Sequence, residues 1–214
     1  MSRFLALNIS ISDDGYMAGP NQSLDEPMGE NGRALHDWVF PTQAMQKWFG
    51  GSGGTTGIDN NYAARGFTNV GATIMGRNMF GPLRGDWLGD EWRGWWGAEP
   101  SFQHPVFILT HYQRESIDMG NGTGFHFITG GIEAAKKQSL ASAAGKDIRV
   151  GGGANTIQQF LEAGILDEIH LAVRPMKLGA GERLFTHPEL QLAHYRALDP
   201  VLSETVVHQT YVKI

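Results

Sequence analysis

The clearest structural signal in the chain lies between residues 147 and 161, which read Asp147-Ile148-Arg149-Val150-Gly151-Gly152-Gly153-Ala154-Asn155-Thr156-Ile157-Gln158-Gln159-Phe160-Leu161. Ile148 and Val150 are β-branched and typical of a strand. The three glycines let the backbone turn sharply, and Asn155 or Thr156 can cap a helix that starts there. Apolar residues then recur at helical spacing. The stretch therefore predicts a strand, a glycine turn and a helix.

A second strand after this helix completes one unit of a parallel α/β sheet. Gly164 is expected to end the helix, and residues 169–173 alternate in the way a strand does. Ligands of parallel sheets bind at the carboxyl ends of the strands, which is where the glycine turn lies. Unpaired N–H groups and the helix dipole suit a phosphate there. The alternative is a tight turn that needs glycine only for its geometry.

Composition limits the class of protein. A chain of 214 residues with 41% hydrophobic residues can form one domain, residues 1–214. It contains no cysteine, which excludes disulfides, thiolate nucleophiles, iron–sulfur clusters and cysteine zinc sites. The formal charge of −5 argues against a nucleic-acid partner. No apolar run reaches the roughly 18 residues of a membrane helix, so we expect a cytoplasmic protein without a membrane partner.

Two further features are expected near the amino end. Residues 4–12 alternate as a strand, with Leu5, Leu7, Ile9 and Ile11 on one core-facing face. The loop that follows, residues 13–20, leaves the carboxyl end of this strand and either covers a ligand or forms an ordinary surface turn. A helix over residues 43–49 is expected next, with proline at an early position.

Polar or basic residues also follow two other predicted strands. Residues 72–75 form a short apolar strand that ends at Gly76 and Arg77, and residues 105–111 form a buried strand that ends in Thr110 and His111. A guanidinium at a strand end matches a phosphate, although a surface ion pair is the alternative. Extended residues at 204–214 are expected to close the sheet.

A segment rich in tryptophan is harder to interpret. Trp87, Trp92, Trp95 and Trp96 lie close together among the charged residues Asp86, Asp90, Glu91 and Arg93. Such aromatic density favours a satellite core or a subunit interface, and a platform that stacks a sugar or a base is the alternative.

Several common catalytic motifs are missing. There is no Walker loop, no Gly-x-Ser-x-Gly elbow and no His-Glu-x-x-His, and the turn after Val150 lacks the last glycine of the dinucleotide fingerprint. The eight histidines are scattered, so we predict no metal site.

Four strings lie at strand ends in a fixed order: Ile11–Pro20, Ile74–Phe80, Val106–His111 and Val150–Leu161. In order and spacing they resemble the dihydrofolate reductase superfamily. More narrowly, the chain resembles the branch that includes the C-terminal reductase domain of the bifunctional riboflavin biosynthesis protein, to which Asp167–Leu171 and Pro175–Phe185 also correspond. The resemblance implies a three-layer α/β fold, with a mixed, mostly parallel central sheet flanked by helices, and NADPH across the strand ends.

The same resemblance assigns cofactor-binding roles. Gly76, Arg77 and Asn78 correspond to a segment that holds the cofactor's phosphates, and Thr110 and His111 to residues near the adenosine 2′-phosphate. The turn under the pyrophosphate corresponds to Gly151, Gly152, Gly153, Ala154, Asn155 and Thr156. The loop that closes over nicotinamide corresponds to residues 14–20, including Asp14, Gly15, Ala18 and Gly19.

Two positions depart from the family pattern and concern the substrate. Gln43 stands where dihydrofolate reductases carry an acid, and Gly151 stands where riboflavin reductases carry one. Asp37 is then the nearest acid for a catalytic role, orienting a polar heterocycle or assisting proton delivery, beside Trp38, Phe40 and Gln43 as substrate-binding candidates. The alternative for Asp37 is capping or ordinary exposure.

Two functions remain open from the sequence. The first is an NADPH-dependent reductase that acts on a C=N or C=O bond of a small heterocycle, such as a pterin or an aminopyrimidine. The second, motivated by the two missing acids, is a non-catalytic NADP-binding or scaffold protein. The resemblance also implies a homodimer.

Overall fold

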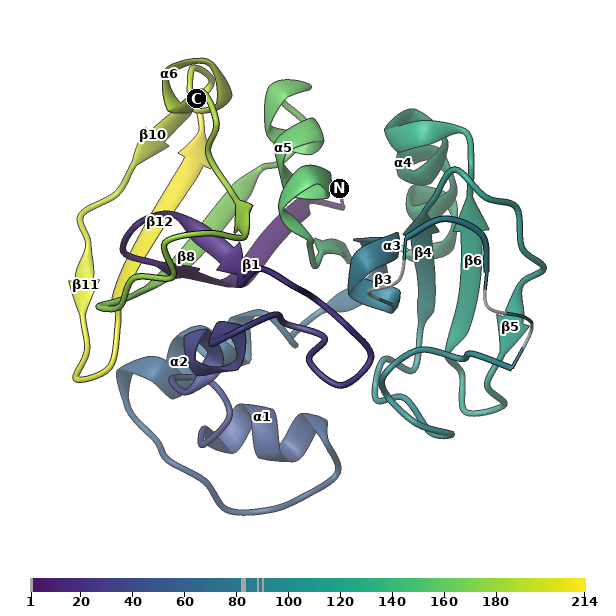
Figure 1. Cartoon of the computed structure of the whole chain (residues 1–214), viewed down its shortest axis with the longest axis horizontal. Helices are drawn as coiled ribbons and strands as arrows, with labels where there is room; N and C mark the ends of the chain where they lie inside the picture. Colours follow the sequence, from purple (N-terminus) through teal and green to yellow (C-terminus); the bar gives the residue numbers. More distant parts are fainter. Residues whose placement is uncertain (1, 82–83, 88, 90) are drawn as a thin grey trace.

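A mixed β-sheet forms the centre of the molecule (Figure 1). The computed structural model describes residues 2–81, 84–87, 89 and 91–214. Among them, ten strands form one sheet in the order β10-β12-β8-β1-β7-β3-β4-β6-β5, with β11 paired to β12. The strands from β8 to β6 run parallel, and antiparallel strands complete both edges. The sheet is therefore mixed and mostly parallel, as the sequence predicts.

The structure contains the predicted strands and helices and adds further elements, including α2 and α6. The strands of the sheet are β1 (Phe4–Ser12), β3 (Val70–Gly76), β4 (Pro105–Leu109), β5 (Ile117–Asp118), β6 (Gly124–Ile128), β7 (Asp147–Val150), β8 (Glu168–Arg174), β10 (Tyr195–Ala197), β11 (Val201–Leu202) and β12 (Val207–Lys213). A separate antiparallel pair joins β2 (Tyr16–Ala18) to β9 (Glu182–Arg183). The helices are the 3-10 helix η1 (Gly32–His36), α1 (Gln43–Trp48), α2 (Ile58–Arg65), α3 (Arg77–Phe80), α4 (Gly131–Ser142), α5 (Ala154–Glu162) and α6 (Pro188–Gln191).

Helices cover both faces of the sheet and give three layers. Helices α4 and α5 pack on the face that presents Ile148 and Val150, where the largest apolar cluster lies. Helices α1 and α2 lie on the opposite face, and Figure 1 shows them below the sheet with α4 and α5 above it. In the described part of the chain, no helix is long and apolar enough to cross a membrane.

Strand β1 contains a bulge that the sequence does not predict. Between Ala6 and Ile9 its register against β8 shifts by one residue, and Asn8 between them has a positive φ of 61°. The extra residue moves Ile9 onto the same face as Ala6, where both join the main core. The predicted single face of Leu5, Leu7, Ile9 and Ile11 is therefore wrong, because the bulge reverses the alternation halfway along the strand.

Two predicted helix starts also differ. Helix α5 begins at Ala154, two residues earlier than a cap at Asn155 would place it, with Gly153 as its N-cap and no side-chain cap. Pro41 precedes helix α1 rather than opening it, and the Oγ1 of Thr42 accepts a hydrogen bond from the Met45 amide at 3.2 Å.

The tryptophan segment packs mainly as a satellite core. Trp87, Trp92 and Trp96 pack against a buried cluster that includes Phe80 and Phe125. This agrees with the first interpretation of the segment, but Trp95 and Trp96 also line the cleft described below. Asp90 of this segment lies outside the described residues.

Candidate active site

A cleft of about 820 Å³ opens at the carboxyl ends of strands β3, β4 and β7. One part, here called the glycine end, is lined by Gly76, Arg77, Asn78, Thr110, His111, Gly151, Gly153, Ala154, Asn155 and Thr156. A second part, called the aromatic end, is lined by Phe40, Trp48, Phe49, Phe67, Trp95, Trp96 and Phe102. A volume of this size accommodates a drug-sized ligand.

Two parallel strands hold the glycine end together. The Gly76 amide donates to the Gly152 carbonyl at 2.7 Å, and the Gly151 amide donates to the Ile74 carbonyl at 2.8 Å. A Cβ on Gly76 would lie 2.5 Å from Oγ1 of Thr156, so only glycine allows the turn to approach β3 this closely. A Cβ on Gly153, by contrast, would meet no atom within 4 Å. The turn thus packs closely against Gly76 on one side, and the space beside Gly153 is open.

The amino end of α5 faces this opening. No side chain caps it, and Ala154, Asn155 and Thr156 of its first turn line the cleft. Their amides have no partner inside the helix, and the helix dipole adds partial positive charge. Free N–H groups beside a bare glycine suit the phosphates of a nucleotide, so the residues present fit such a cofactor.

Arg77 lines the glycine end, but its guanidinium has other partners. Its terminal nitrogens donate to the carbonyl of Gly85 and, at 3.2 Å, to that of Asp86, and its Cζ lies 3.7 Å from the ring centroid of Trp87. Burial lowers its pKa from the ordinary value, and Nε has no hydrogen-bond partner within the described part of the chain. Arg77 therefore anchors the loop beyond α3, with Nε left for a ligand.

Thr110 and His111 lie at the carboxyl end of β4 and also line the cleft. The Thr110 hydroxyl accepts a hydrogen bond from the Tyr112 amide at 3.1 Å. Beside them, Thr129 and Gly131 line the cleft at the end of β6 and the start of α4, whose amino end also lacks a side-chain cap. Sequence reasoning missed this fourth strand end, although Thr129-Gly130-Gly131 before a helix carries the same signal as residues 151–156.

The predicted nicotinamide loop is tied down rather than free. Asp14 accepts hydrogen bonds from the Ser12 hydroxyl at 2.6 Å and from the amides of Leu178 and Gly179 at 3.1 and 2.8 Å. These bonds, the Ser12 bond first, lower the pKa of Asp14 to about 2. Asp14, Gly15 and Gly19 do not line the cleft, whereas Ala18 does. Gly19 instead packs against the backbone of Glu30.

The predicted substrate residues are mostly placed elsewhere. Asp37 is 57% exposed and its carboxylate lies 3.9 Å from a nitrogen of Arg174, outside the cleft. Trp38 is 1% exposed and its ring nitrogen donates to Ser10 at 2.9 Å in the core. Gln43 is exposed and does not line the cleft. Of these candidates, only Phe40 reaches the cleft.

Three other side chains bring unpaired polar atoms to the cleft lining. Oδ1 of Asn8, Nδ1 of His36 and Nε of Arg149 are buried and have no hydrogen-bond partner among the residues that the structure describes. Burial lowers the pKa of His36, so its imidazole is neutral at pH 7. Polar atoms buried without partners are rare in proteins, so these three beside the cleft are candidates for pairing with a ligand or with water.

A hydrogen-bonded chain of buried rings fixes Asn8. The backbone amide of Asn8 donates a hydrogen bond to Nδ1 of His170 at 3.3 Å. The proton of the neutral His170 ring therefore lies on Nε2, which donates to Nδ1 of His208 at 3.0 Å. His208 in turn donates to Asp59 at 2.8 Å. Burial lowers the pKa of His170 to about 3, which keeps the ring neutral. Gly66 leaves room for the side-chain amide of Asn8, since a Cβ on Gly66 would lie 2.1 Å from Nδ2 of Asn8.

A family model, the RibD C-terminal domain, matches residues 3–209. The chain belongs to this family. The RibD C-terminal domain is a reductase domain, and the match confirms the resemblance seen in the sequence. No curated protein matches the chain.

Solved structures confirm the dihydrofolate reductase-like fold. A candidate riboflavin biosynthesis protein from Shewanella sp. PV-4 matches with a TM-score of 0.61 at 20% identity, over 100% of this chain and 99% of that one. A dihydrofolate reductase from Enterococcus faecalis, complexed with NADP(H) and RAB-propyl, matches at 0.50 and 13% identity over 99% and 96% of the two chains. The Thermotoga maritima diaminohydroxyphosphoribosylaminopyrimidine deaminase/5-amino-6-(5-phosphoribosylamino)uracil reductase matches at 0.51 and 10% identity, over 100% of this chain and 57% of that one.

Proposed function

We propose that this RibD C-terminal domain is an NADPH-dependent reductase that acts on a C=N or C=O bond of a small heterocycle, of the pterin or aminopyrimidine type. The family is a reductase domain, and the Enterococcus neighbour is a dihydrofolate reductase complexed with NADP(H). The observation that carries the proposal is the open glycine turn, where Gly153 and the uncapped first turn of α5 face a cleft of about 820 Å³.

Each part of the cleft has a defined role in this proposal. The amides of Gly153 and the first turn of α5 hold the phosphates, with Thr110 and Thr129 at the neighbouring strand ends. When bound, the cofactor supplies a hydride from nicotinamide C4. The aromatic end excludes water and stacks the substrate ring, and Asn8 and His36 present acceptors to its N–H groups. The resident side chains thus supply position and electrostatics.

The second candidate is a non-catalytic NADP-binding protein. Among the described residues that line the cleft, the one carboxylate is that of Glu182, which is paired with Arg84 at 2.6 Å. His36 is neutral, and Asp37 lies outside the cleft. A reductase of this design would take its proton from water or from the substrate, whereas a binding protein would need no donor.

Titration calorimetry with NADPH and NADH tests the proposal. NADPH is expected to bind at micromolar concentration and more tightly than NADH, and the absence of NADPH binding would refute it. Steady NADPH oxidation with any pterin, aminopyrimidine or quinoid compound would then eliminate the non-catalytic candidate. Binding without turnover across such a screen would favour the binding protein.

We also propose a homodimer, which the family resemblance implies, and a cytoplasmic location. Analytical ultracentrifugation checks the assembly: a monomer at micromolar concentration would contradict it.

A further inference from the structure

Arg149 is a cationic side chain without a partner at the edge of the cleft. No hydrogen bond or ion pair involves its guanidinium in the part of the chain that the structure describes, and its Nε is buried. Burial lowers its pKa to about 10, which still leaves it charged at neutral pH. The nearest acid on its strand, Asp147, is already paired with Arg3 at 3.0 Å.

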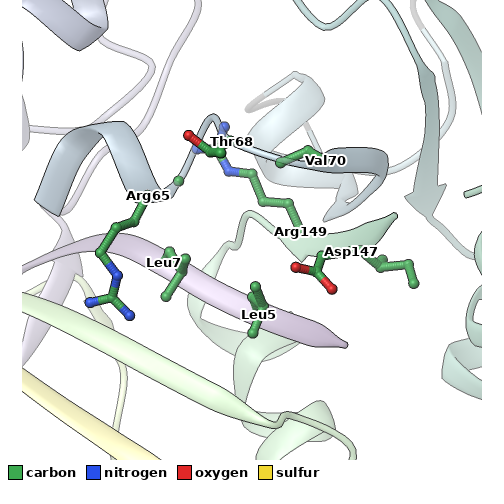
Figure 2. Close-up of a pocket in the computed structure, with 9 residues that line it drawn as sticks. Leu5, Leu7, Arg65, Thr68, Val70, Asp147 and Arg149 are labelled. Atoms are coloured by element: carbon green, nitrogen blue, oxygen red, sulfur yellow. The ribbon is translucent and has the colours of Figure 1, made fainter. Parts of the chain in front are cut away.

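The position of Arg149 separates it from the glycine end. Ile148 and Val150 point to the face that α5 covers, so alternation along β7 directs Arg149 to the opposite face. There its Cζ lies 5.4 Å from the ring centroid of Phe67, and Figure 2 shows the side chain reaching toward the loop that carries Thr68. Arg149 is therefore unsuited to the phosphates at α5 and belongs with the aromatic end.

A purely structural role does not account for this residue. The hollow in Figure 2, which Arg149 borders with Leu5 and Leu7, measures about 10 Å³ and holds one water at most. One cation–π contact with Phe67 offsets only part of the cost of burying an unpaired charge. Arg149 also lines the cleft, which is large enough for an anion.

We propose that Arg149 binds an oxyanion substituent, a carboxylate or a phosphate, carried by the ring that occupies the aromatic end. This inference rests on the proposed function for its assignment of that end to the substrate. Phe67 lies under the guanidinium, and Trp48 stacks on Phe67 with ring centroids 5.3 Å apart. A flat ligand ring could therefore contact these aromatic side chains while its acidic group contacts Arg149. A planar guanidinium matches such an oxyanion with two parallel hydrogen bonds. Arg149 would then select acidic substrates over neutral analogues.

A matched pair of probes isolates the charge. Binding of 4-fluorobenzoate and of uncharged 4-fluorobenzamide is followed by ¹⁹F NMR on the protein without NADPH. The wild type is expected to bind the benzoate about ten-fold or more tightly than the benzamide, because a charge-assisted hydrogen bond is lost in the amide. Arg149→Met should abolish the preference, and Arg149→Lys should retain part of it.

Arg65→Met is the control, because Arg65 borders the same small hollow but already pairs with Glu168. It should keep the wild-type preference. Equal binding of the two probes by the wild type, including no binding of either, would overturn the proposal, as would a preference that survives in a folded Arg149→Met protein. Since no NADPH is present, failure of this test is distinct from failure of the NADPH titration.

Discussion

Gly153 allows the proposed cofactor site to be tested without disturbing the fold. Its φ of −74° and ψ of −165° are open to any residue, and an added Cβ would meet no atom within 4 Å. Gly153→Ala should therefore leave the free energy of unfolding unchanged or raise it by up to about 1 kcal/mol. The new methyl group would instead project into the cleft, where the phosphates are proposed to contact the backbone.

The expected loss of NADPH affinity follows from that contact. A hydrogen bond between a backbone amide and a charged oxygen contributes about 1.5–3 kcal/mol, so its loss should weaken binding about 10- to 150-fold. Calorimetric titration with NADPH measures the affinity, and urea unfolding measures stability. Gly51→Ala is the control, because Gly51 also lacks a positive φ, is exposed and lies outside the cleft. Its added Cβ would lie 3.2 Å from the carbonyl oxygen of Gln46, so urea unfolding of this variant is measured as well.

Unchanged NADPH affinity in a folded Gly153→Ala protein would refute the assignment of this turn to the cofactor. Loss of affinity together with a large loss of stability would also count against the reasoning, because the methyl group would then have disturbed the turn itself.

Two further predictions concern the buried rings. Between pH 6.5 and about 3 the unfolded chain binds a proton at His170 that the folded protein does not, so stability should fall as the pH is lowered through that window. At pH 4 the proton bound by the unfolded chain should lower the free energy of unfolding by about 3 kcal/mol relative to pH 7. In urea unfolding, His170→Asn should therefore show a weaker pH dependence of stability than the wild type, whereas the exposed control His194→Asn should not. Parallel pH curves for His170→Asn and the wild type would contradict this prediction. Trp38→Phe should lower the free energy of unfolding by about 1–3 kcal/mol, because the buried Ser10 loses its donor, and leave NADPH affinity unchanged. Weaker NADPH binding in that variant at wild-type stability would contradict the core placement of Trp38.

The glycine end could be predicted because its signals are local. A strand, a run of glycine and a helix start fix the place of residues 151–156, and Gly76 and Thr110 follow their strands in the same way. Parallel pairing then brings these ends to one edge. Thr129 and Gly131 carry the same local signal, so the sequence also contains the information that places them at this edge.

Apart from Phe40, the aromatic end could not be predicted because its residues meet only through tertiary packing. Asn8 sits in the middle of an apolar alternation, and nothing in that pattern reveals the bulge that turns it toward the cleft. Arg149 is part of the clearest stretch in the sequence, yet the lack of an acidic partner among the described residues becomes visible only from the tertiary structure. Asp37 was chosen for its apolar neighbours in sequence, but Trp38 turns into the core while Asp37 faces solvent.

The sheet order also bears on how the protein is made. Strand β1 pairs with β7 and β8, so its first partners, Phe4 with Ile148, are separated by most of the chain. On the ribosome, this apolar strand is synthesised long before either neighbour exists, and contacts of such long range are slow to form. Newly made chains should therefore depend on chaperones until β8 has emerged, and truncations before Arg174 should aggregate rather than yield a smaller folded unit.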